Sequence, residues 1–217
     1  MSNPDSFIQE VNEEVRRDRL FGYLRRYGWI AVLVVLLVVG GAAWNEWRKA
    51  RDQAAAEAFG DAVLTALGGP DSAARIRALD GIDADGSRAA ILKLLSAGEA
   101  QRAGDTDAAL AIFAEVEADA GLPPSYRQLA ALKRVMLAGP DLPMAERESV
   151  LAGLAEPDRP FRPLALEQIA LLRIEAGDRA AALELLQELM DEPDATQGLR
   201  ARAQQLIVAL GGASAEG

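Results

Sequence analysis

Residues 104–116 read GDTDAALAIFAEV, and residues 177–189 read GDRAAALELLQEL. In each stretch a Gly-Asp pair precedes a run of helix-forming residues, an alanine follows the glycine by five positions, and a large apolar residue comes four positions later. Gly104 and Gly177 are 73 positions apart, which is close to two units of about 36 residues. The sequence therefore predicts repeated helical hairpins.

Helical patterns continue on both sides of each Gly-Asp pair. The helices predicted for the repeats cover residues 88–103, 107–120, 124–138, 144–154, 163–176 and 179–191, and a last helix at 197–210 covers the end of the stack. The middle hairpin turns through Gly139-Pro140 and matches the pattern least. The predicted fold is all-α, with about three hairpins and a capping helix forming an α-solenoid within residues 88–217. An unrelated helical bundle is the alternative.

Six residues are predicted to hold the hairpins together. Glycine makes the tight turn, the small alanine lets two helices approach closely, and the large apolar residue fills the groove of the neighbouring hairpin. The residues in these roles are Gly104, Ala109 and Phe113 in one copy, and Gly177, Ala182 and Leu186 in the other.

A long apolar segment lies near the N-terminus. From Gly28 to Trp44 the chain reads GWIAVLVVLLVVGGAAW, without a charged residue. As a helix this segment would be about 25 Å long, close to the ~30 Å hydrocarbon core of a bilayer. Residues expected at the two bilayer surfaces are the aromatic Tyr27, Trp29, Trp44 and Trp47 and the basic Arg25, Arg26, Arg48 and Lys49. Residues 27–47 are therefore predicted to form a single transmembrane helix.

Two alternatives exist for this segment. A buried core helix is disfavoured because core helices rarely lack polar residues over such a length. A signal peptide cleaved near Gly41-Ala42-Ala43 would be more than forty residues long, with an acidic start unlike a short basic one.

Arginines before the segment predict its orientation. Five of them, Arg16, Arg17, Arg19, Arg25 and Arg26, favour a cytoplasmic N-terminus by the positive-inside rule. In a bacterium the C-terminal domain would then face the periplasm from the inner membrane. Residues 1–26 carry a helical apolar pattern, which fits either an amphipathic helix on the membrane surface or a solvated cytoplasmic tail.

Residues 48–87 are predicted to be a membrane-proximal helical connector. The helix of the apolar segment continues through residues 50–67 and ends at Gly68-Gly69-Pro70. A short helix at 72–79 and the turn-rich stretch DGIDADG follow.

Composition limits the possible functions. The chain has neither cysteine nor histidine, which excludes disulfides and removes the commonest metal ligand and general base. Residues 52–217 contain fifteen basic against twenty-seven acidic side chains, a balance that disfavours nucleic acid as a partner. The acidic pairs Asp83/Asp85 and Asp105/Asp107 are in turns, where helix capping explains them. We therefore expect no enzymatic activity, metal or cofactor.

The Gly-Asp turn, the alanines and the spacing resemble the tetratricopeptide repeat, with Pro193 near its terminal proline. The whole layout, with the apolar segment, AAAEAFGDAV and the terminal run LALEQIALLRIEAGDRAAALELLQEL, resembles the bacterial YfgM-type proteins. Those are ancillary subunits of the SecYEG translocon, whose repeat domain is shared in name with the division coordinator CpoB. The resemblance implies a periplasmic scaffold with chaperone-like function that binds proteins beside the translocon and a membrane-tethered chaperone. A scaffold of another envelope complex, for division or respiration, is the alternative.

Repeat domains of this kind usually bind partners along the concave surface formed by the first helix of each hairpin. Basic residues predicted for that surface are Lys93, Arg127, Lys133, Arg134 and Arg173. The same residues also fit an ordinary surface of salt bridges, and this second interpretation is favoured. If they bind a partner, reversing the charge of Arg134 and Arg173 should leave the stability nearly unchanged.

Overall fold

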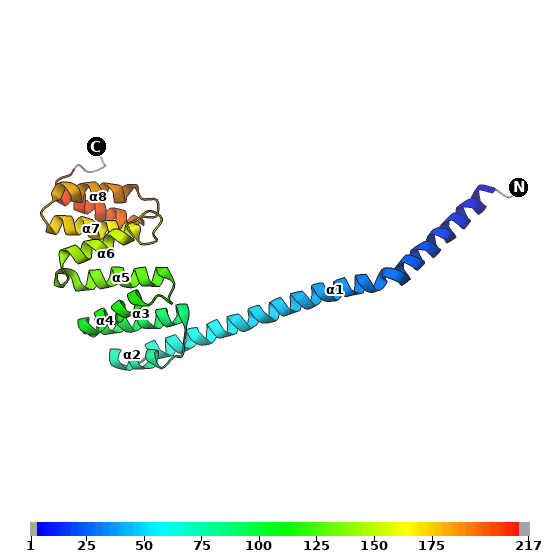
Figure 1. Cartoon of the computed structure of the whole chain (residues 1–217), viewed down its shortest axis with the longest axis horizontal. Coiled ribbons are helices and arrows are strands. Elements are labelled where there is room, and N and C mark those ends of the chain that lie inside the picture. The colour runs from blue at the N-terminus through cyan, green and yellow to red at the C-terminus, as the bar shows by residue number, and fades with distance from the viewer. Residues whose placement is uncertain (1–3, 213–217) are drawn as a thin grey trace. The chain divides into compact units, whose positions relative to one another are not determined.

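The computed structural model describes the backbone of residues 4–212 and the side chains of residues 25, 26, 29, 30 and 32–212 (Figure 1). Between residues 4 and 212 there are nine α-helices, one short 3-10 helix and no strand, which confirms the all-α class. The helices are α1 (Pro4–Leu67), α2 (Ser72–Asp80), α3 (Gly86–Arg102), α4 (Thr106–Ala118), α5 (Pro124–Ala138), η1 (Gly139–Asp141), α6 (Met144–Leu154), α7 (Arg162–Glu175), α8 (Arg179–Asp191) and α9 (Gln197–Ala209).

The predicted helices of the repeats are confirmed to within two residues at every end. For α5, α6 and α8 both ends agree. The agreement follows from local signals. A proline stands at the start of α5, where its missing N–H removes no helical hydrogen bond, and an aspartate caps α2, α4 and α8.

α1 is one helix as far as Leu67, so the predicted continuation beyond the apolar segment is confirmed. From Trp29 to Trp47, every side chain that the structure describes is exposed. Among the described residues, no helix combines the length and the apolarity that crossing a membrane requires. The predictions for Tyr27 and for the amphipathic character of residues 1–24 concern side chains outside the described residues.

The chain divides into two compact units at Gly60/Asp61. This boundary falls inside the segment predicted as a connector, residues 48–87. The second part of that segment packs with the repeats, because Leu79 of α2 is fully buried and Ile76 contacts the core formed by α3, α4 and α5.

Three apolar clusters form the core of the second unit, and consecutive helices share each of them. The first includes Phe113 and joins α3, α4 and α5; the second includes Leu151 and joins α5, α6 and α7. The third includes Leu186 and joins α7, α8 and α9. Figure 1 shows α5, α6, α7 and α8 stacked in chain order. Each hairpin thus buries its apolar faces against its neighbours, as a repeat array does.

Candidate protein-binding surface

The two Gly-Asp turns have the same backbone geometry. Gly104 has φ of 78° and Gly177 has φ of 77°, values that favour glycine. The N–H of the following aspartate, Asp105 or Asp178, donates to the carbonyl five residues earlier, at 2.9 and 2.8 Å. Each aspartate Oδ1 then accepts from the backbone N–H three residues later, at 3.0 and 3.1 Å. One dipeptide therefore ends the first helix of a hairpin and caps the second.

The alanines and the large apolar residues of the two copies lie in the core. Ala109 and Ala182 are fully buried, as are Phe113 and Leu186. Phe113 belongs to a cluster with alanines of both α3 and α5, which places it between its own hairpin and the next.

Glycines with positive φ mark the ends of α3, α5, α7 and α9 and give these helices a common register. These glycines are Gly104, Gly139, Gly177 and Gly211. Eight positions before each glycine stands a buried residue: Ser96, Ala131, Ile169 and Ala203. The residue six positions before each glycine is exposed: Gly98, Lys133, Leu171 and Gln205. The residue three positions before each glycine is exposed or partly buried: Gln101, Met136, Ile174 and Val208.

Several side chains at these open positions are large and apolar. Met136 is 51% exposed, Leu171 39% and Val208 52%, and Ile174 is partly buried. We call these four residues the apolar strip. Equivalent positions on successive first helices of a repeat array fall on one face, so the strip is a surface that apolar side chains of a partner can cover.

Four of the five basic residues predicted for a partner surface are instead held within the repeat unit. Arg134 is only 16% exposed and bonds the carboxylates of Glu117 and Glu146. Arg127 is partly buried and donates to the carbonyl of Glu117 at 3.1 Å. Arg173 bonds Glu148, and Lys93 pairs with Glu115 at 3.2 Å. These contacts fit the alternative of an ordinary surface of intramolecular contacts, and a role of the five residues in partner binding stays a prediction.

Lys133 is the exposed member of the five, and its ammonium lies 6.0 Å from the centroid of the Phe113 ring. It stands three residues before Met136, on the same side of α5. Lys133 therefore contributes positive charge to the edge of the apolar strip.

Ion pairs connect the helices throughout the second unit. They are Arg75–Glu99 (α2 to α3), Lys93–Glu115 (α3 to α4), Arg134–Glu117 (α5 to α4), Arg134–Glu146 (α5 to α6), Arg147–Glu175 and Arg173–Glu148 (α6 to α7), Arg162–Glu188 (α7 to α8), and Arg202–Glu167 (α9 to α7). These ion pairs contribute to cohesion between the helices of the second unit.

Glu99 is the most buried acid of these pairs, with its side chain 4% exposed. Ser72 Oγ and Arg75 Nη1 each donate to it at 3.1 Å, and Arg102 Nη1 lies 2.8 Å away. Burial raises the pKa of Glu99, but the hydrogen bonds from Arg75 and Ser72 and the charge of Arg102 outweigh it and hold the pKa below its ordinary value of 4.5. An acid that is ionised and saturated with donors is a structural group rather than a proton donor.

In α1 the aromatic and basic residues predicted for an anchor are exposed wherever their side chains are described. Trp29, Trp44 and Trp47 are each more than half exposed, and the rings of Trp44 and Trp47 are 5.2 Å apart between centroids. The basic residues Arg25, Arg26, Arg48 and Lys49 are also exposed. In the described part of the chain, no group of three or more acidic side chains is arranged to hold a metal ion.

A family model described as a tetratricopeptide repeat-like domain matches residues 22–157. This match covers more than half of the chain, which therefore belongs to that family. It includes the apolar segment of α1 together with α2 to α6, and α7, α8 and α9 continue the helical stack beyond it. No curated protein and no solved structure matches the chain. Repeat domains of this class are typically modules for protein–protein interaction without catalytic activity.

Proposed function

We propose that the protein is a membrane-anchored scaffold whose repeat unit binds segments of partner proteins through the apolar strip. The observation that carries this proposal is the exposure of Met136 and Val208 at the same position of α5 and α9, with Leu171 exposed three residues before the equivalent position of α7. Exposed apolar side chains on a monomer usually mark an interaction surface when they lie together.

The membrane part of the proposal rests on the apolar segment of α1. Successive residues from Val32 to Val39 are exposed, so apolar side chains point in every direction around the helix. A partner helix would cover one side of such a segment, whereas lipid covers all of them. Tryptophans and basic residues flank the segment at both ends, as expected at two bilayer surfaces.

The proposal also names the compartment of the repeat unit and its partners. Membership in the repeat family and the resemblance to YfgM-type proteins favour a location at the bacterial inner membrane, with the repeat unit in the periplasm. The apolar strip would then meet chains emerging from the SecYEG translocon, in cooperation with a membrane-tethered chaperone. A division or respiratory assembly is the competing class of partner.

The test is photo-crosslinking in intact cells from position 171, followed by identification of the crosslinked proteins. We expect translocon subunits or newly exported proteins among them. The double substitution M136D/V208D should reduce their yield about tenfold, because it places two charges in an apolar interface. The control A111D/Q187D adds the same charge at exposed positions on α4 and α8 and should retain the crosslinks.

Equal loss in both double variants would contradict the apolar strip as the binding surface. Crosslinks to division or respiratory subunits, and none to translocon subunits, would keep the scaffold and replace its partner.

A further inference from the structure

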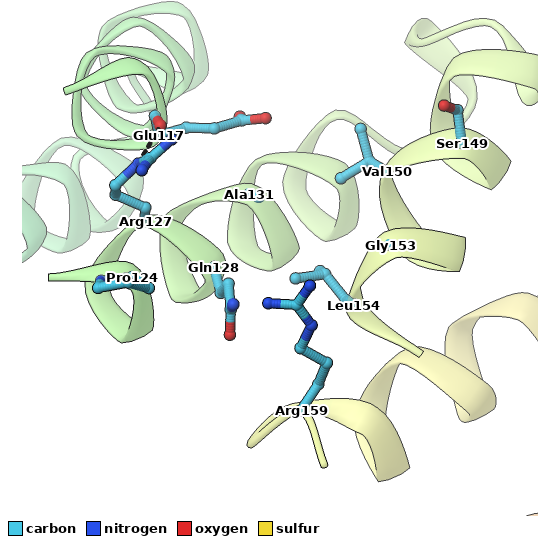
Figure 2. Close-up of a pocket in the computed structure, with 10 residues that line it drawn as sticks. All are labelled: Glu117, Pro124, Arg127, Gln128, Ala131, Ser149, Val150, Gly153, Leu154 and Arg159. Carbon is cyan, nitrogen blue, oxygen red and sulfur yellow. Dashed lines mark hydrogen bonds between the residues drawn. The ribbon is translucent and has the colours of Figure 1, made fainter. Parts of the chain in front are cut away.

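A groove runs between α5 and α6, the two helices of the middle hairpin, and encloses a volume of about 540 Å³ (Figure 2). Volumes of this size are typical of ligand-binding sites. Lys133 and Met136 do not line it, so the groove is distinct from the apolar strip on the same helix.

Small residues keep this groove open. Ala131 of α5 and Gly153 of α6 line it, and a Cβ atom at Gly153 would meet nothing within 4 Å. The apolar floor is formed by Ala131, Val150 and Leu154, of which Ala131 and Leu154 belong to the second core cluster. The floor is therefore rigid and fits an aliphatic side chain.

One polar group in the groove lacks a hydrogen bond. The side-chain oxygen of Gln128 is buried, and no donor among the described residues reaches it. An unsatisfied buried acceptor costs roughly 1–3 kcal/mol. Because this oxygen has almost no accessible surface, the Gln128 side chain has to turn towards the groove before a ligand N–H can reach it and recover that energy. A backbone amide of a bound peptide provides such a donor.

Two guanidinium groups and one carboxylate, that of Glu117, line the groove. Glu117 is paired with Arg134, so Arg127 and Arg159 leave the groove with a positive balance. Arg127 binds a backbone carbonyl, and no carboxylate in the described residues pairs with it.

Among the described residues, the carboxylate that pairs with Arg159 is that of Glu156, three residues earlier, in an exposed ion pair that is easily exchanged. Figure 2 shows the Arg159 guanidinium turned towards Gln128 and Leu154. An acidic group of a ligand would therefore find a partner at the edge of the apolar floor.

We propose that the groove between α5 and α6 binds an extended segment of a partner protein in which an aliphatic residue is followed by an acidic one. The aliphatic side chain lies on Ala131, Val150 and Leu154. A backbone N–H of the segment donates to Gln128 Oε1, and the carboxylate accepts from Arg159. The negative balance of charge over residues 52–217 disfavours polyanions such as nucleic acids.

The test uses the full chain in detergent micelles and a short fluorescent peptide of glycines with a central Leu-Glu pair. Fluorescence anisotropy should detect binding, and replacing the glutamate by lysine or the leucine by serine should weaken it at least tenfold. R159Q and Q128L should each weaken binding of the Leu-Glu peptide about tenfold. R77Q, which removes an exposed arginine on α2, should leave binding unchanged.

Q128L has a second readout. Because it replaces an unsatisfied buried group by an apolar one, it should maintain or raise the melting temperature while it weakens binding. Binding that does not distinguish glutamate from lysine, or that survives both R159Q and Q128L, would overturn the proposal, as would the absence of binding at millimolar peptide. If M136D/V208D abolishes peptide binding and R159Q does not, the peptide occupies the apolar strip. The groove proposal then fails while the proposed function stands.

Discussion

At the residue scale, the environment of Glu99 makes stability depend on pH in a defined direction. Its pKa is lowered in the folded state, so its ionised form stabilises the fold above the ordinary carboxylate value of 4.5. This contribution is lost as the pH falls through the lower, folded-state pKa. The melting temperature should therefore fall on acidification below about pH 5.

The variant E99Q isolates this effect. It should lower the melting temperature at pH 7, because Arg75 loses its charged partner, and it should flatten the acid dependence below pH 5. E115Q is the matched control, since Glu115 is 63% exposed in its ion pair with Lys93. An acid dependence equally steep in wild type and E99Q would refute the assignment.

At the scale of elements, the bounds of the helices could be predicted from the sequence, but the ion pairs between the helices could not. Helix ends depend on local signals such as Gly104-Asp105, and local signals can be read from one stretch of chain. Arg134 meets Glu117 and Glu146, which are 17 and 12 positions away on two different helices. Spacing along one helix shows which side a residue faces, but not which neighbouring helix supplies the opposite charge.

The apolar strip was missed for a related reason. Met136 and Val208 stand within short apolar runs, VMLA at 135–138 and LIVAL at 206–210, so nothing local distinguishes them from core residues. Met136 and Val208 each stand three positions before a glycine, Gly139 or Gly211, and the sequence alone shows this equivalence. The sequence does not show that both side chains are exposed.

Arg134 links three helices, and reversal of its charge should destabilise the second unit. R134E would place its carboxylate beside those of Glu117 and Glu146, at a position only 16% exposed. We expect a loss of about 1–3 kcal/mol in the free energy of unfolding, measured by urea denaturation of the full chain in detergent. This replaces the expectation of unchanged stability.

The neighbouring K133E provides the control for that measurement. Lys133 is exposed and bonds no carboxylate in the described residues, so K133E should change the free energy of unfolding by less than about 1 kcal/mol. If R134E and K133E were equally stable, the ion pairs of Arg134 would contribute nothing to cohesion between α4, α5 and α6.

At the scale of the whole molecule, the proposed function requires the repeat unit to lie on one particular side of a membrane. The chain contains no cysteine, so a single introduced cysteine can report its compartment without background. S87C places a thiol at an exposed position at the start of α3, and S2C places one at the other end of the apolar segment. Neither position lies in the groove or in the apolar strip.

We expect S87C to react with a membrane-impermeant maleimide in intact spheroplasts, and S2C to react only after lysis. Both variants should remain in the membrane fraction after an alkaline carbonate wash, because the proposed anchor buries the exposed apolar side chains of α1 in lipid. Release by carbonate would contradict the anchor. Retention with labelling of S87C only after lysis would put the repeat unit in the cytoplasm. The partners would then have to be sought there, since a surface on that side cannot meet chains that have left the translocon.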